Sequence, residues 1–261
     1  MGGVVGVTSS GDQQHARIAW VMPMLFALLL GACAGVVSGG APDLQPDRQG
    51  VRNVGIVTAF GDKFHVQKIG GAAFGNEHKE IAVASWGIDD LVVGRVRALL
   101  GRTFNVKPVK YRKSPYLTPN RGGIGAMVHE SVYPADVESY VVLTKSISPV
   151  GATNQSVSGL GILATEGLNG SGTLMVHALY QISVVSGESF SSRGTTSALL
   201  QGEAVFDPTR MTFLNGPHRQ VDQSWWPTSL NAASIEHLKA AAVELIDQSL
   251  PGTLRQMELI D

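Results

Sequence analysis

The chain has 261 residues, a formal net charge of −1 and only 16% charged side chains. This near-neutral composition lacks the strongly charged surface that nucleic acids or anionic lipid headgroups require, so we expect no nucleic-acid partner. A single cysteine excludes an internal disulfide, and the 44% of hydrophobic residues are enough to form a packed core.

The first distinctive stretch is the apolar run from Ile18 to Leu30. A polar leader precedes it, and two small residues connect it to Cys33, the only cysteine. An uncharged core of this length followed by small residues is typical of a signal peptide. The tetrapeptide Leu30-Gly31-Ala32-Cys33 resembles the lipobox of bacterial lipoproteins.

That resemblance implies that Cys33 carries a lipid, that residues 1–32 are removed and that the new amino end is acylated. Ala34 stands where many inner-membrane lipoproteins have aspartate, so the resemblance implies the outer membrane. Several acyl chains would hold the protein firmly in the membrane, because each buried methylene adds about 0.8 kcal/mol to the free energy of membrane binding. Two alternatives stay open, namely an uncleaved membrane helix from Ile18 to Val37 and a plain secretory signal in which Cys33 has no role.

Behind the leader, the composition changes twice. Residues 33–53 mix Gly, Pro, Asp and Gln without an apolar period, which predicts a flexible, lipid-anchored tether. Residues 54–261 carry regular apolar patterns and are expected to form a single globular domain that faces the periplasm. Its first two β-rich runs, Val54–Phe60 and Lys63–Ile69, are predicted to form a hairpin.

The middle of the chain alternates between helical and extended patterns. The clearest helix is predicted from Asp89 to Leu100, where apolar residues recur every three or four positions. Phe104–Tyr111 is predicted as an edge strand because it contains a proline. Gly122–Glu130 is predicted as a short helix, and the largely apolar Ser139–Lys145 as a buried strand.

The last part begins with a glycine-rich segment. Ser146–Thr173 is predicted as a long loop, and Thr173–Val185 as the longest strand, with alternate residues facing the helices. A final helix is predicted from Ser234 to Leu250, with Ser234 as its N-cap and Pro251-Gly252 as its end. Together these elements indicate an α+β fold in which two main helices pack on one face of a mixed sheet, as a two-layer sandwich.

The order of these elements carries a second resemblance. A lipoprotein leader, a tether, alternating strands and helices, a glycine-rich loop, a hairpin and a terminal helix are similar to the domain of curli-secretion lipoproteins, of penicillin-binding-protein activator lipoproteins and of the amino-terminal part of TolB. The resemblance spans about Val54 to Leu250 and includes no residue motif. It implies binding to envelope proteins. The segment Ile88–Val106 also resembles bacterial lipoproteins of no assigned activity.

Motifs of common hydrolases are missing from the sequence. It has no Gly-x-Ser-x-Gly elbow, and the segment that starts like a zincin motif at His129 has Tyr133 in place of the second histidine. The remaining enzyme candidate is a metal or acid–base set of Asp207, His218 and Asp222 in one irregular segment. The plainer interpretation is that these are three solvated loop residues. His65 and His177 fall inside predicted strands, where a surface or hydrogen-bonded histidine is the plainer interpretation.

The pair Trp225-Trp226 favours binding. Adjacent residues in an extended segment point in opposite directions, so one ring can be buried while the other contacts a partner. The alternative is that both rings cover the sheet beneath the last helix. We therefore expect an outer-membrane lipoprotein that binds another envelope component, with no catalysis, cofactor or metal. The alternative is a periplasmic hydrolase or metal-dependent enzyme that uses Asp207, His218 and Asp222.

Overall fold

The computed structural model describes residues 51–70, 75–117, 123–151, 153–166, 172–200, 214–229, 231 and 235–261. These residues belong to one compact unit. None of the helices within them combines the length and the hydropathy that crossing a membrane requires.

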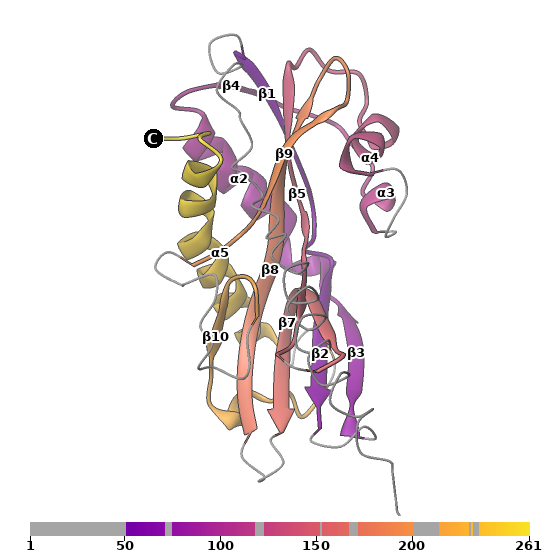
Figure 1. Cartoon of the computed structure of the whole chain (residues 1–261), viewed down its shortest axis with the longest axis vertical. Coiled ribbons are helices and arrows are strands. Elements are labelled where there is room, and N and C mark those ends of the chain that lie inside the picture. Colours follow the sequence, from indigo (N-terminus) through magenta and orange to yellow (C-terminus); the bar gives the residue numbers. More distant parts are fainter. Residues whose placement is uncertain are drawn as a thin grey trace, which may run out of the picture. The chain divides into compact units, whose positions relative to one another are not determined.

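The described residues form a mixed sheet with helices (Figure 1). Its strands are β1 Asn53–Ala59, β2 Lys63–Ile69, β3 Glu77–Ala82, β4 Asn105–Lys107, β5 Ser139–Lys145, β6 Ile147–Pro149, β7 Ser156–Glu166, β8 Gly172–Ser186, β9 Ser192–Ser197 and β10 His218–Gln220. The α-helices are α2 Ile88–Leu100, α3 Ser114–Leu117, α4 Gly123–Ser131 and α5 Glu236–Gln256, and the short 3-10 helices are η3 Ala84–Trp86 and η4 Gln223–Trp225.

Strand β8 is shared by two half-sheets. Its second half pairs with β5 and β9, and its first half pairs with β7 and β10. From β5 the upper half-sheet continues in parallel through β1 to β4, whereas from β7 the lower half-sheet continues through β2 to β3. The two half-sheets lie above and below each other in Figure 1.

Strands β1 and β2 do not form the hairpin predicted from the sequence. β1 pairs with β4 and β5, whereas β2 pairs with β3 and β7. The short connection 60–62 therefore carries the chain from the upper to the lower half-sheet. The prediction was wrong because local alternation identifies a strand but not its partner.

Helices α2 and α5 pack together on one face of the sheet, as predicted. The residues of β8 that point to this face are buried in the same core as both helices; they are Leu174, Val176, Ala178, Tyr180, Ile182 and Val184. The hydroxyl groups of Tyr180 and Ser249 lie 2.8 Å apart and join β8 to α5 inside this core. The expected mixed α–β architecture with its two main helices on one face is confirmed.

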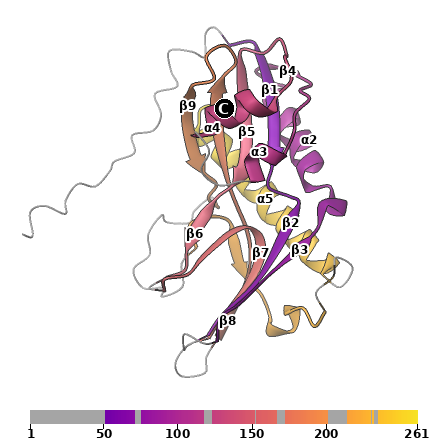
Figure 2. The ribbon, with the colours of Figure 1, turned by 90° about the vertical axis from the view of Figure 1, so that its right-hand side faces the viewer.

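The opposite face carries two separate covers that the sequence did not reveal (Figure 2). On the upper half-sheet, residues of α3 and α4, such as Tyr116 and Val128, pack against β1, β5 and the end of β8. On the lower half-sheet, Val150 and Leu214 pack against β2, β7 and the start of β8. The sheet is therefore covered on both faces, and the expected two-layer sandwich holds only for the helical face.

The glycine-rich segment is not the long loop that its composition predicted. It contains the 11-residue strand β7, which lies between β2 and β8. Glycines and serines in β7 hid its alternation. The apolar residues Leu160 and Ile162 face the helices, whereas Gly159 and Gly161 lie on the other face, beside histidines of neighbouring strands.

The predicted helices agree best with the structure where a clear apolar period defines them. The structure confirms α2 and α4 to within a residue at each end. The end of α5 was wrong, because the helix continues through Pro251 to Gln256. Leu250 and Leu254 are buried on both sides of the proline, and this packing holds the last turns in place. The predicted N-cap, Ser234, lies outside the described residues.

Candidate functional site

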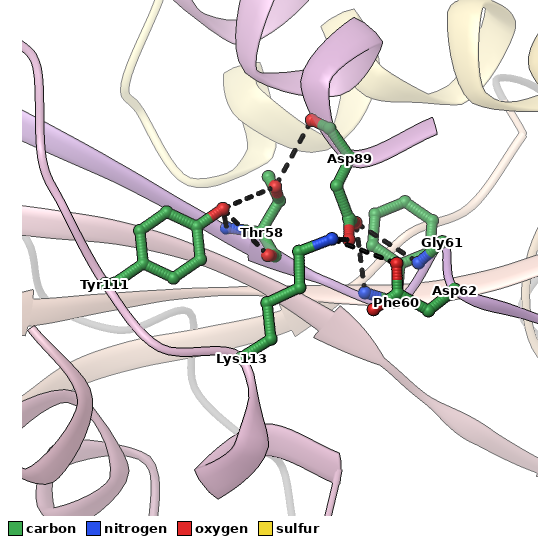
Figure 3. Close-up of polar contacts among 7 residues, drawn as sticks. All are labelled: Thr58, Phe60, Gly61, Asp62, Asp89, Tyr111 and Lys113. Carbon is green, nitrogen blue, oxygen red and sulfur yellow. Dashed lines mark hydrogen bonds and ion pairs between the residues drawn. The ribbon is translucent and has the colours of Figure 1, made fainter. Parts of the chain in front are cut away.

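Charged side chains meet where the chain passes from β1 to β2 (Figure 3). Asp89, in the first turn of α2, is only 3% exposed. Its Oδ1 accepts hydrogen bonds from the backbone N–H groups of Phe60, at 3.2 Å, and Gly61, at 3.1 Å. This aspartate therefore holds the connection between the half-sheets against α2.

Lys113 pairs with two carboxylates at the same place. Its Nζ lies 2.6 Å from Oδ2 of Asp89 and 2.9 Å from Oδ1 of Asp62. Burial lowers the pKa of the ammonium group, but hydrogen bonds and charge from the two carboxylates outweigh burial, so the pKa is raised. Lys113 is protonated at neutral pH and is not available as a nucleophile or base.

Thr58 and Tyr111 complete this junction network. The Tyr111 hydroxyl donates to the carbonyl oxygen of Thr58 at 3.0 Å and accepts from its N–H at 3.2 Å. The Thr58 hydroxyl donates to the carbonyl oxygen of Asp89 at 3.2 Å. Because these polar groups are paired with one another, the network stabilises the connection between the two half-sheets.

A second polar set crosses the lower half-sheet as a row of opposed residues. His65 of β2 lies opposite Glu80 of β3 and Gly161 of β7. Gly161 lies opposite His177 of β8, and His177 lies opposite His218 of β10. Directly opposed residues point to the same face of a sheet. We call His65, His177 and His218 the histidine row; it lies on the face away from α2 and α5.

His177 is the buried centre of the row. Its Nδ1 donates to the carbonyl oxygen of Gly159 at 3.0 Å, so Nε2 carries the lone pair. Among the described residues, Nε2 has no hydrogen-bond partner. Burial lowers the pKa of His177 to about 3, although the bond to Gly159 opposes the shift. The ring is therefore neutral at neutral pH.

His65 meets two further residues at the outer end of the row. Its Nδ1 lies 3.1 Å from Nε2 of His78 and 3.8 Å from Oε1 of Glu80. The two imidazole planes are 8° apart and their centroids 5.4 Å apart, so the rings meet edge to edge at these two nitrogens. Burial lowers the pKa of His65 to about 4, although the charge of Glu80 opposes the shift. His65 is also neutral at neutral pH.

The structure describes two members of the alternative enzyme set, His218 and Asp222. Asp207 lies outside the described residues. His218 donates from Nδ1 to the carbonyl oxygen of Gly216 at 2.8 Å, whereas Asp222 accepts from the N–H of Ser224 at 2.9 Å and caps η4. Each of these two side chains therefore forms a hydrogen bond to the backbone two residues away in its own segment.

Trp225 and Trp226 are both half-buried and pack against the core beneath α5. The ring of Trp225 meets that of His237 edge to face, with centroids 5.4 Å apart, and the Arg219 guanidinium lies 5.9 Å from its centroid. This arrangement fits the alternative in which both rings cover the sheet, and it leaves part of each ring accessible. Cys33 lies outside the described residues.

Sequence analysis missed His78 and Glu80. Their spacing of two residues places both on one face of a strand, and this was the available signal. They lie beside His65 only because β2 pairs with β3. The sequence prediction paired β2 with β1 instead, so this proximity was missed. Neither the models of known protein families nor the curated proteins gave a match to this chain.

Proposed function

We propose that this protein is a lipoprotein, anchored in the outer membrane through Cys33, whose periplasmic domain binds another protein of the cell envelope without catalysis. The lipobox resemblance supports the anchor. The observation that carries the binding role is an open edge of the sheet at β3. The accessible parts of Trp225 and Trp226 are a second candidate contact.

Strand β3 has only one neighbour, β2, among the described strands. Five of its six residues are exposed, all except Ile81. The outer edge of such a strand presents backbone N–H and C=O groups that can pair with an extended segment of another chain. Its charged side chains, Glu77, Lys79 and Glu80, disfavour unspecific pairing and favour a partner with complementary charges.

The enzyme alternative has weaker support in the described residues. Lys113 is paired with both aspartates of the junction network, and His218 and Asp222 form separate hydrogen bonds. A cavity of about 340 Å³ next to Glu138 and Arg193 is lined by none of the histidines. These observations favour a binding role over a hydrolase.

Site-specific photocrosslinking tests the proposal. A photoreactive amino acid replaces Lys79, on the open edge, in cells that produce the full chain. Arg102, exposed in the turn after α2, is the matched control position. We expect Lys79 to give an adduct that maps to an extended segment of one envelope protein and is absent from the control. No adduct at Lys79, or the same adducts at both positions, would contradict binding through β3.

A further inference from the structure

The pairing of β2 with β3 brings three metal-ligating side chains to one point. His65 and Glu80 are directly opposed, and His78 precedes Glu80 by two residues, so all three side chains share a face. One ligand atom from each, a ring nitrogen or a carboxylate oxygen, lies within 4.8 Å of the other two. His65 and His78 are 13 positions apart in the chain, so the pairing of the two strands is what brings them together.

These separations fit a shared metal ion. Around a tetrahedral zinc ion, with ligand bonds of about 2.0–2.1 Å, neighbouring ligand atoms lie about 3.3 Å apart. Nδ1 of His65 is 3.1 Å from Nε2 of His78 and 3.8 Å from Oε1 of Glu80. His78 and Glu80 are both exposed, and rotation of these two side chains would aim their ligand atoms, together with Nδ1 of His65, at a common point.

The chemical state of the donors also suits a metal ion. His65 is buried, and its Nδ1 faces both His78 and Glu80. Glu80 turns Oε1 toward His65, and its other oxygen pairs with Lys63. Two imidazoles and a carboxylate favour Zn²⁺ and similar transition metals over Mg²⁺ and Ca²⁺, which prefer oxygen ligands alone.

We propose that His65, His78 and Glu80 bind one divalent transition-metal ion, of which Zn²⁺ is the representative, at the outer end of the histidine row. The fourth position is open to water or to a ligand from a bound partner. The ion joins β3 to β2 and so stabilises the edge strand. This site does not depend on the anchor at Cys33.

Zinc titration by calorimetry tests the site on the full chain in mild detergent. The parent protein carries Cys33→Ser, because the only cysteine would otherwise compete for the metal. We expect one Zn²⁺ per chain. His78→Gln and Glu80→Gln, both at exposed positions, should each weaken binding at least about tenfold. His237→Gln, an exposed histidine on α5, is the matched control and should leave the affinity unchanged.

Two further measurements make the result decisive. Circular dichroism verifies that each variant is folded. Co²⁺ in place of Zn²⁺ should give the visible absorption of a tetrahedral site in the parent and in His237→Gln, but not in the variants of His78 and Glu80. The proposal is overturned if the parent binds no stoichiometric zinc. It is also overturned if the double variant His78→Gln/Glu80→Gln binds zinc as tightly as the parent.

Discussion

At the scale of single residues, His177 places a titratable ring inside the lower half-sheet. The side chain is fully buried. Strand β7 lies between it and His65, and Gly161 of β7 is opposite both histidines. Protonation of either ring would put a charge into a poorly solvated region. The fold therefore requires both histidines to stay neutral, which makes its stability sensitive to mildly acidic pH.

We expect the free energy of unfolding to fall as the pH drops from 6.5 toward 4.5. Below pH 6.5 the unfolded chain protonates both rings, whereas pKa values of about 4 for His65 and about 3 for His177 keep them neutral in the folded chain. The unfolded state then binds more protons, so stability rises with pH throughout this window. Urea denaturation should show a loss of about 2–5 kcal/mol between pH 7 and pH 4.5.

Two variants test whether the buried histidines cause this pH dependence. His177→Asn should remove roughly half of the loss, since one of the two rings no longer titrates. His129→Gln, at an exposed position of α4, should leave it unchanged. Glu80 and Asp222 have lowered pKa values, so their contributions are lost at more acidic pH. A stability that stays constant from pH 7 to pH 4.5 would show that the histidines are not buried as described.

At the scale of elements, the glycines of β7 leave room for histidine side chains of the neighbouring strands. A Cβ at Gly161 would lie 2.6 Å from Nε2 of His177 and 2.6 Å from the carbonyl oxygen of His65. Both distances are shorter than a van der Waals contact allows. The glycine is therefore required by the histidine row, and the strand is held by its pairs with β2 and β8.

Gly161→Ala should destabilise the protein by about 1–3 kcal/mol, because the added methyl group overpacks the space beside His177. Gly94→Ala is the matched control. Gly94 is exposed in α2, with no atom within 4 Å of an added Cβ, and alanine there should stabilise the helix by about 0.5–1 kcal/mol. Urea denaturation measures both. Equal effects of the two substitutions would contradict the close packing at Gly161.

The elements that could be predicted from the sequence are those with a strong local period. α2 and β8 were found because their apolar residues recur every three or four positions, or every second position. β7 was missed because its second face carries glycine. The partners of β2 were wrong because neither β3, whose residues are mostly polar, nor β7 was predicted as a strand. For the same reason, His65 was treated as an isolated strand residue, although His78 and Glu80 complete its surroundings.

At the scale of the whole molecule, the proposed role joins an anchor at Cys33 to a folded domain that begins at Asn53. The tether predicted between them would give the domain reach from the membrane surface. The open edge at β3 belongs to the lower half-sheet and the first residue of β1 to the upper one. Anchoring and binding would thus use different parts of the chain and can be tested separately.

Cys33→Ala tests the anchor. The unaltered protein should carry acyl groups and partition with the membrane, whereas the variant should lack the acyl mass and move to the soluble fraction. Intact mass and fractionation measure both properties. Membrane retention of both proteins with the full leader would indicate a spanning helix, and cleavage and solubility of both would indicate plain secretion; either result contradicts the lipid anchor.

The position of β1 has a mechanical consequence for an anchored protein. β1 runs parallel to β4 on one side and to β5 on the other, and the carboxylate of Glu138 accepts hydrogen bonds from the N–H groups of Arg52 and Asn53 at its start. Tension applied through Arg52 along the axis of β1 would shear the hydrogen bonds on both sides of the strand together. They would not open one after another. A domain loaded in this direction would therefore resist pulling more than one that is peeled from an edge strand.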